Sequence, residues 1–428
     1  GEMVVITANY RLGAFGFLGL EEFRSRDPAG STGNYGSLDQ RAVLQWIHDN
    51  IQAFGGDPNN VVLWGESAGA AAVTAHLSMP GSFPLFHKAI MESGAFNGWS
   101  YRTLADAQAN ALTLAHNLGC MGGADNMTVN MTCLELVDAE QMVALDDDGA
   151  GEAGVQRDEE GHIKNYSMPF MDTIDKSLWS PVIDGVVLSG TPVSLLREGK
   201  TADVPMLFGT NRDEGSTFTG NLSGTGDGLH TYDSFYNAWL YSADQVAFMA
   251  SDPHGGGASA YEAELLQNES QFVVWATDMF GANASKIVTE MYRPGSKSEL
   301  GVQIKDWWWS ASGVVGDFVL SCPARRTART IETLNRNQST YVFYFDHTPN
   351  ISVNQPATSL WGAFHGSEVP FAWYDVFELA QTDEQQLSAA MVQYWVNFAW
   401  NGDPNAPPPH QESPPKLPVW EAYTAKDD

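Results

Sequence analysis

Residues 61–73 read VVLWGESAGAAAV, and this stretch decides the fold. Strand-forming residues run from Val61 to Trp64, a serine then stands between two glycines, and small helix-forming residues follow. In a sharp turn from strand to helix the central backbone is strained, so the residues two places before and after it must be small. Gly65 and Gly69 meet this requirement. The pattern predicts that Ser67 stands at the carboxyl edge of a sheet as a nucleophile.

Strand and helix patterns alternate around this stretch. Residues 3–10, MVVITANY, form a β-prone run, and apolar residues at helical spacing fill residues 38–54 before Gly55. Further along, the sequence predicts strands at 88–91, 204–209 and 341–345 and a helix at 104–118. This alternation predicts an α/β fold with a mainly parallel central sheet and helices on both faces.

A largely helical insertion is expected before the strand at 341–345. It contains Trp307, Trp308 and Trp309, which could line a substrate cleft or pack along a helix face. Residues 402–418 are proline-rich and indicate an extended surface segment. Because there is no internal repeat and no independent second unit, residues 1–428 are expected to form a single domain.

The composition describes an acidic globular protein. Of its 428 residues 43% are hydrophobic and 17% charged, and 22 basic against 52 acidic residues give a net charge of -30. Such a charge repels nucleic acid and anionic lipid surfaces. No apolar run approaches the ~18 residues of a membrane span. We therefore expect no nucleic-acid partner and no stable membrane insertion, and nothing here predicts the oligomeric state.

Cysteines and glycosylation sequons both indicate secretion. Cys120 and Cys133 bracket a short Gly/Asn/Thr-rich stretch that a disulfide could close into a loop, which leaves Cys322 over and expected to be buried beside Pro323. Glycans attach to Asn-x-Ser/Thr only in the secretory pathway. Such sequons begin at Asn126, Asn130, Asn165, Asn221, Asn268, Asn283, Asn337 and Asn350.

A nucleophilic serine needs a histidine to take its proton and an acid to orient that histidine. In α/β hydrolases the three follow the order serine, acid, histidine. Asp213 and Glu214 come directly after the strand at 204–209, and either carboxylate could be the acid. His347, which follows a strand, and His365, in the loop GAFHGSEVPF, are the best placed of the later histidines. Spacing alone leaves both pairs open.

Longer segments carry a resemblance that chooses between these alternatives. From about Met3 to about Tyr423 the chain resembles the type-B carboxylesterases/lipases, the family that includes cholinesterases and fungal lipases. The segments that carry the resemblance are NYRLGAFGFLGLE, GNYGSLDQRAVLQWIHDNIQAFGGDPNNVVLWGESAGAAAV, MESGAF, GTNRDEGSTF, CPARR and FHGSEVPF.

The resemblance implies an α/β-hydrolase fold and a Ser-His-Glu triad. By this similarity Ser67 is the nucleophile, Glu214 and not Asp213 is the acid, and His365 is the base. The amide of Ala68 would contribute to the oxyanion hole. The pair Cys120 and Cys133 also corresponds to a disulfide of the family, which supports an extracellular location.

The expected function is hydrolysis of a small-molecule or lipid carboxylic ester through an acyl-enzyme, without metal or cofactor. One alternative is a lipase that acts on triacylglycerols. Another is a binding protein or a catalytically impaired fragment on the same scaffold. In relatives that have lost catalysis the serine is replaced, whereas all three triad positions are intact here.

The resemblance also predicts that the chain is the carboxyl-terminal majority of a longer protein. In this family a glycine-rich HGGG-like loop supplies the remaining oxyanion donors and precedes the strand that resembles MVVITANY, but this chain begins at Gly1. The chain is thus expected to lack its N-terminal strands and its oxyanion loop. Residues 1–428 alone are expected to be essentially inactive and aggregation-prone, with Ser67 in a cleft open on that side.

Overall fold

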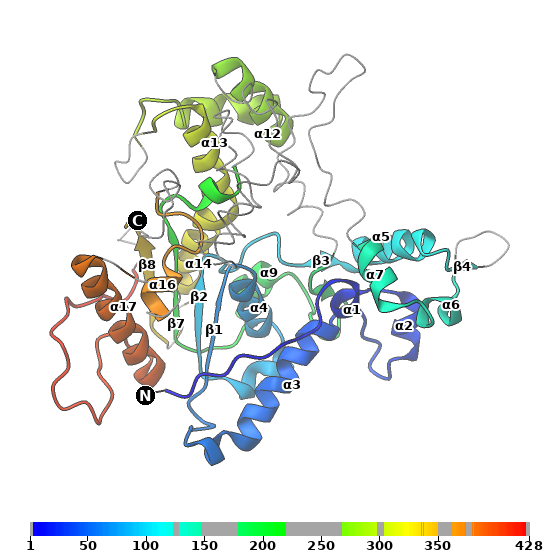
Figure 1. The fold of residues 1–428 in the computed structure, drawn as a ribbon, viewed down its shortest axis with the longest axis horizontal. Coiled ribbons are helices and arrows are strands. Elements are labelled where there is room, and N and C mark those ends of the chain that lie inside the picture. Colours follow the sequence, from blue (N-terminus) through cyan, green and yellow to red (C-terminus); the bar gives the residue numbers. More distant parts are fainter. Residues whose placement is uncertain are drawn as a thin grey trace, which may run out of the picture.

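Four parallel strands form the central sheet of the computed structural model, in the order β1-β2-β7-β8 (Figure 1). The strands are β1 (Val62–Glu66), β2 (Lys88–Glu92), β7 (Met206–Asn211) and β8 (Thr340–Phe345). The structure describes residues 3–122, 128–146, 179–219, 268–297, 304–334, 336, 338–349, 362–373, 379 and 381–424. The predicted parallel α/β architecture is confirmed.

Helices and two small strand pairs surround this sheet. Strands β3 and β6 pair in parallel, whereas β4 and β5 form an antiparallel pair. These strands are β3 (Arg102–Thr103), β4 (Met121–Gly122), β5 (Thr128–Val129) and β6 (Val182–Ile183). The helices are α1 (Gly13–Phe17), α2 (Glu21–Arg26), α3 (Tyr35–Asn50), α4 (Ala68–Leu77), α5 (Leu104–Asn117), α6 (Met131–Glu135), α7 (Ala139–Asp146), α9 (Pro192–Arg197), α12 (Glu269–Met291), α13 (Trp307–Gly316), α14 (Cys322–Thr333), α16 (Val369–Trp373) and α17 (Thr382–Asn401).

The side chains of the central strands divide the core between two faces. Met91 of β2 and Phe208 of β7 are buried against α4 and α14. Their neighbours Ile90 and Leu207 point the other way and are buried against α16 and α17. Successive residues of a strand alternate between faces, so a run of apolar residues needs cover on both sides. Figure 1 shows α4 and α17 on opposite sides of the sheet.

The carboxyl ends of the central strands meet at one edge of the sheet. In the register of the sheet Glu66 lies opposite Glu92, and Glu92 lies opposite Gly209. Open parallel sheets bind their ligands beyond this edge, in the loops that leave the strands. The loops after β1, β2 and β7 therefore converge on one region.

The prediction of a strand at residues 3–10 is wrong. Met3 to Tyr10 run past β1 without belonging to any strand, and Val4, Val5 and Ile6 are exposed. A groove of about 830 Å³ separates this segment from Val61 to Trp64 at the edge of the sheet. Strand formation depends on pairing and packing partners, and this segment has no strand partner among the described residues.

The insertion before β8 is helical where the structure describes it, which confirms the prediction. Its tryptophans pack within the helical layer: Trp307 lies against Phe272, with ring centroids 5.1 Å apart, and Trp308 donates a hydrogen bond to the carbonyl of Thr219 at 2.6 Å. Of the two interpretations of the tryptophan run, packing along a helix face describes these contacts. None of the described helices is long and apolar enough to cross a membrane.

The predicted disulfide between Cys120 and Cys133 is present. It joins the end of the α5 segment to α6 and closes the β4–β5 pair into a loop. Cys322 lies outside this disulfide at the start of α14 and is half-buried, so the expectation that it is buried is only partly met.

Candidate active site

Ser67 occupies the turn between β1 and α4. Its backbone has φ 54° and ψ -118°, a left-handed conformation that a residue with a side chain rarely adopts. Its amide donates a hydrogen bond to the carbonyl of Glu92 at 2.9 Å, and its carbonyl accepts one from the amide of Ala71 at 2.9 Å. The turn is thus fixed on both sides, as strained residues at functional sites must be.

The glycines around Ser67 differ in whether a side chain would fit at their positions. A Cβ on Gly65 would lie 2.3 Å from the carbonyl carbon of Gly69, whereas a Cβ on Gly69 would meet none of the described atoms within 4 Å. Gly94, which the pattern did not single out, also packs on the turn, because its Cβ would lie 2.5 Å from the carbonyl oxygen of Ser67. The small residues required by the turn are therefore Gly65 and Gly94.

Alanine at Gly65 and alanine at Gly69 should have different effects on stability. Gly65→Ala pushes β1 and α4 apart and is expected to cost about 1–3 kcal/mol, as overpacking does. Gly69→Ala adds a good helix former without a clash and should leave stability unchanged or raise it by up to ~1 kcal/mol. Thermal unfolding of the two variants beside the wild type measures this. Equal melting temperatures for both variants would contradict the close-packing argument.

Ser67, His365 and Glu214 lie in one chain of hydrogen bonds. His365 Nε2 is 2.7 Å from Ser67 Oγ, and His365 Nδ1 is 2.6 Å from Glu214 Oε2. The His365 residue is 7% exposed and the Glu214 residue 1% exposed, whereas Ser67 is half-buried, so the base and the acid are shielded from water and the serine is reachable. The structure thus brings together the three residues singled out by the resemblance.

Glu214 is held by two further donors. It begins a short 3₁₀ turn, Glu214–Thr217, directly after β7. Its Oε1 accepts hydrogen bonds from the amide of Asn211 at 2.7 Å and from Ser93 Oγ at 2.5 Å. Ser93 follows β2 and also has a positive φ of 54°. Sequence reasoning missed this role of Ser93, although the segment MESGAF was part of the resemblance.

The competing residues are engaged elsewhere. Asp213 pairs with Arg212 and with the amide of Ala363. His347 Nε2 lies 2.9 Å from Glu384 Oε1 of α17. His410 lies against Trp400, with ring centroids 5.1 Å apart, and two other histidines, His230 and His254, are outside the described residues.

Comparison with known proteins gives the family. A model of the carboxylesterase family matches residues 1–428. The chain belongs to the carboxylesterase family. It is 30% identical over 432 residues to an acetylcholinesterase of Bungarus fasciatus, in an alignment that covers 99% of this chain and 59% of that protein. The chain therefore spans less than two thirds of the length of this relative. The α/β-hydrolase fold expected from the sequence is that of this family.

In this carboxylesterase-family chain the charge around His365 favours its protonated form. Burial by itself lowers the pKa of His365, but the carboxylates of Glu66 and Glu214 and the hydrogen bond with Glu214 outweigh it, so the pKa is raised. Glu66 Oε1 lies 3.3 Å from His365 Nε2. Two carboxylates thus face the two nitrogens of one imidazole. Such an arrangement stabilises the imidazolium that forms when His365 accepts a proton.

Two more carboxyl groups are buried behind this pair. Glu92 is 1% exposed and accepts a hydrogen bond from Trp395 Nε1 at 2.7 Å, and burial raises the pKa of Glu92 to about 8. Glu368 is fully buried and accepts a hydrogen bond from Asn211 Nδ2, and burial together with the neighbouring carboxylates raises the pKa of Glu368. Both shifts favour the neutral form of the carboxyl group, which limits the negative charge behind the site.

The buried Glu92 should make the protein less stable as pH rises. A glutamate in the unfolded chain ionises near pH 4.3, whereas folded Glu92 keeps its proton up to about pH 8. The free energy of unfolding therefore falls between these two pH values, because the unfolded state binds fewer protons. Glu92→Gln removes this dependence and keeps an acceptor for Trp395.

We expect Glu92→Gln to match the wild type near pH 4.5 and to exceed its stability by a few kcal/mol near pH 8.5. Unfolding by urea at the two pH values measures the difference. Glu412→Gln, at an exposed position, serves as the control and should follow the wild type at both pH values. A pH-independent difference between Glu92→Gln and the wild type would disprove the prediction.

Aromatic side chains lie close to His365. The ring of Phe218 lies 4.9 Å from the imidazole of His365, centroid to centroid. Phe364 belongs to a buried cluster that Trp99 and Phe218 also contact. Among the described residues no group of three or more His, Cys, Asp or Glu side chains could hold a metal ion. The described surroundings of His365 are therefore partly apolar.

Proposed function

We propose that this chain belongs to a carboxylic ester hydrolase that uses Ser67 as nucleophile, His365 as general base and acid, and Glu214 as the acid of the triad. The observation that carries the proposal is the continuous hydrogen-bond chain, with Ser67 Oγ 2.7 Å from His365 Nε2 and His365 Nδ1 2.6 Å from Glu214 Oε2. This geometry meets the requirement that nucleophile, base and orienting group lie within direct hydrogen-bond reach.

The proposed reaction has two halves. His365 Nε2 takes the proton of Ser67 Oγ while that oxygen attacks the ester carbonyl carbon, and the ion pair with Glu214 stabilises the resulting imidazolium. The bond to the alcohol oxygen then breaks as His365 returns the proton to it, which leaves an acyl group on Ser67. Water attacks the acyl-enzyme with the same proton transfers and releases the acid.

The negative oxygen of the tetrahedral intermediate needs donors already in place. The amide of Ala68 is one such donor in the proposal, since Ala68 follows the nucleophile and begins α4. The first amides of a helix have no acceptor within the helix, and the helix dipole adds a partial positive charge there. An anion that forms beside Ser67 would be stabilised by both effects.

We further propose that the protein is a secreted glycoprotein. Two observations support this: the Cys120–Cys133 disulfide and the exposure of the described sequon asparagines Asn130, Asn268 and Asn283. A mass decrease on treatment with peptide N-glycosidase is the expected result. A protein that reaches the medium without any such decrease would rule out the glycosylation.

The test of the proposed hydrolase uses the complete protein and a panel of p-nitrophenyl esters of increasing acyl length, together with acetylthiocholine. Turnover of at least one ester is expected, as is stoichiometric labelling of Ser67 by a fluorophosphonate. The acyl length at which kcat/KM is highest distinguishes an esterase from a lipase. If no ester is turned over and Ser67 is not labelled, the proposal is rejected and a binding protein on the same scaffold is favoured.

A further inference from the structure

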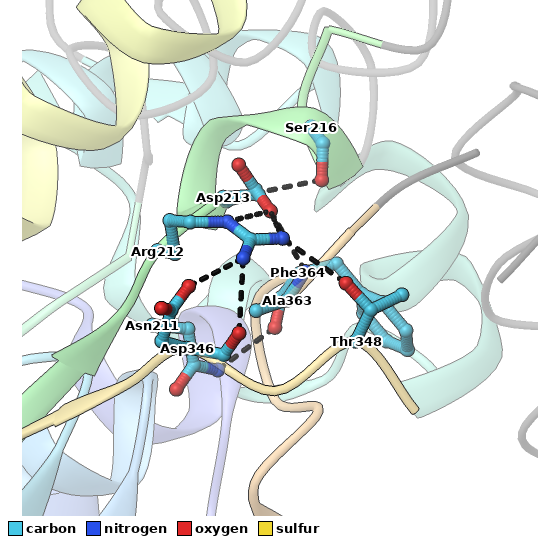
Figure 2. A network of polar contacts seen from close by, with 8 residues as sticks. All are labelled: Asn211, Arg212, Asp213, Ser216, Asp346, Thr348, Ala363 and Phe364. Carbon is cyan, nitrogen blue, oxygen red and sulfur yellow. Dashed lines mark hydrogen bonds and ion pairs between the residues drawn. The ribbon is translucent and has the colours of Figure 1, made fainter. Parts of the chain in front are cut away.

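Several hydrogen bonds join two short segments, residues 211–214 and residues 362–365. The first follows β7 and ends in Glu214, and the second ends in His365. They form a single parallel bridge between Asp213 and Phe364, outside the named strands. Figure 2 shows the polar contacts around this bridge. The distance between the acid and the base of the proposed triad is thus set by how these segments pair.

Asp213 makes two of the hydrogen bonds between the segments. Its amide donates to the carbonyl of Ala363 at 2.8 Å, and its Oδ2 accepts from the amide of Ala363 at 2.8 Å. The side chain therefore completes the pairing that a strand backbone would otherwise provide. Asn211 adds a third bond, from its Nδ2 to the carbonyl of Phe364 at 2.8 Å. Each residue from 363 to 365 is bonded to the segment that carries Glu214.

Arg212 fixes the Asp213 carboxylate in turn. Its Nε and Nη2 lie 2.8 and 2.7 Å from Asp213 Oδ2. On its other side the guanidinium donates to Asp346, both to the carboxylate and to the carbonyl oxygen, and to Thr348 Oγ1 at 3.0 Å. Asp346 and Thr348 follow β8, so Arg212 ties the loop after β7 to the loop after β8, as Figure 2 shows.

Gly362 leaves room for this arrangement. It has a positive φ of 71°, and a Cβ on it would lie 2.0 Å from Asp213 Oδ2. A side chain here would both strain the backbone and displace the carboxylate. The Asp213 carboxylate is 9% exposed, and burial raises its pKa, although Arg212 opposes this effect. Burying a carboxylate is costly unless it has partners, and Arg212 and the amide of Ala363 supply them here.

We propose that Asp213 is a positioning residue of the reaction, which holds His365 within hydrogen-bonding distance of Glu214 and Ser67 through its bonds to Ala363. The proposal rests on the proposed hydrolase function. It assigns a role to the carboxylate that competed with Glu214 in the sequence. Asp213 does not touch the reacting atoms; it acts by fixing the loop that carries His365.

Asp213→Ala should lower kcat by about 10²-fold, because small misplacements of a catalytic group cost this much. KM should stay within about 3-fold of the wild type. Asp213→Asn keeps an acceptor for the amide of Ala363 but loses the charge that faces Arg212, so a loss of about 10-fold is expected. Asp346→Asn removes a carboxylate from the same guanidinium without touching Ala363 and should remain within about 3-fold.

The pH profile separates positioning from a loss of folded protein. The pKa of His365 is raised in part by Glu214, so a looser contact should lower it and move the acid limb of kcat/KM to lower pH. Rates are expressed per site titrated with a fluorophosphonate. Reduced labelling with an unchanged profile would indicate a merely structural role and overturn the proposal, as would wild-type kcat in Asp213→Ala.

Two further measurements test the proposal if Asp213→Ala does not fold or if the wild type has no turnover. Gly362→Ala displaces the same carboxylate from the side of His365 and should reproduce the loss in kcat and the shift of the profile. Nuclear magnetic resonance of labelled histidine gives the pKa of His365 without catalysis. A lower value in Asp213→Asn than in Asp346→Asn supports the proposal, and equal values reject it even where the hydrolase function itself has failed.

Discussion

Replacement of Ser67 by alanine in the complete protein is expected to abolish ester hydrolysis, with a fall in kcat of about 10⁶-fold. The hydroxyl is the only group of the proposed triad that forms a bond to the substrate. Its loss leaves His365 with no proton to take at 2.7 Å. Alanine fits the site, because it removes one oxygen and leaves the turn of β1 and α4 unchanged. Initial rates with the preferred p-nitrophenyl ester measure the effect.

His365→Ala should reduce kcat by a similar factor, and the double variant should be no worse than either single variant, because the two residues act as one unit. Ser25→Ala, an exposed serine on α2, is the control and should retain wild-type rates. Circular dichroism and the melting temperature verify that each variant is folded. Turnover in Ser67→Ala at even a hundredth of the wild-type rate would mean that another group is the nucleophile.

The turn at Ser67 between β1 and α4 could be predicted from the sequence because its causes are local. A serine with a positive φ directly after a strand requires a small residue at position 65. The sequence contains both the serine after a strand pattern and the glycine at position 65. The parallel sheet follows from alternation of apolar strands with helices, and the observed strands start or end within about two residues of the expected ones. The Cys120–Cys133 disulfide could also be predicted, because the two cysteines are close in sequence and bracket a short stretch that a disulfide closes into a loop.

The sequence patterns could not predict which segments distant in sequence pair with each other. Residues 3–10 have strand propensity but lie across a groove from β1, and propensity does not specify a partner. Spacing along the chain left His347 and His365 both open as the base, and the fold places one beside Glu384 and the other beside Glu214. Ser93 contacts Glu214 from a different strand. Each of these results depends on which strands are neighbours, which spacing along the chain does not determine.

The same limit applied to Asp213 and Glu214, and a pair of substitutions tests the choice between them. Glu214→Gln should lower kcat by about 10⁴-fold, as the loss of charge at this position does in other triads. The contacts of Glu214 explain how this substitution would lower kcat. Oε1 of Glu214 accepts from the amide of Asn211 and from Ser93 Oγ, so the oxygen of a glutamine is held at that position. The amide nitrogen must then take the place of Oε2.

An amide nitrogen 2.6 Å from His365 Nδ1 can only donate to it, so the imidazole must carry its proton on Nε2, which faces Ser67. In that tautomer His365 cannot accept the proton of Ser67 Oγ, and the nucleophile stays inactive. Asp213→Asn leaves this tautomer unaffected and should cost only about 10-fold, by loosening the loop. Parallel kcat measurements on the two isosteric variants therefore should differ by about 10³-fold. A larger loss in Asp213→Asn than in Glu214→Gln would show that the wrong carboxylate has been assigned as the acid.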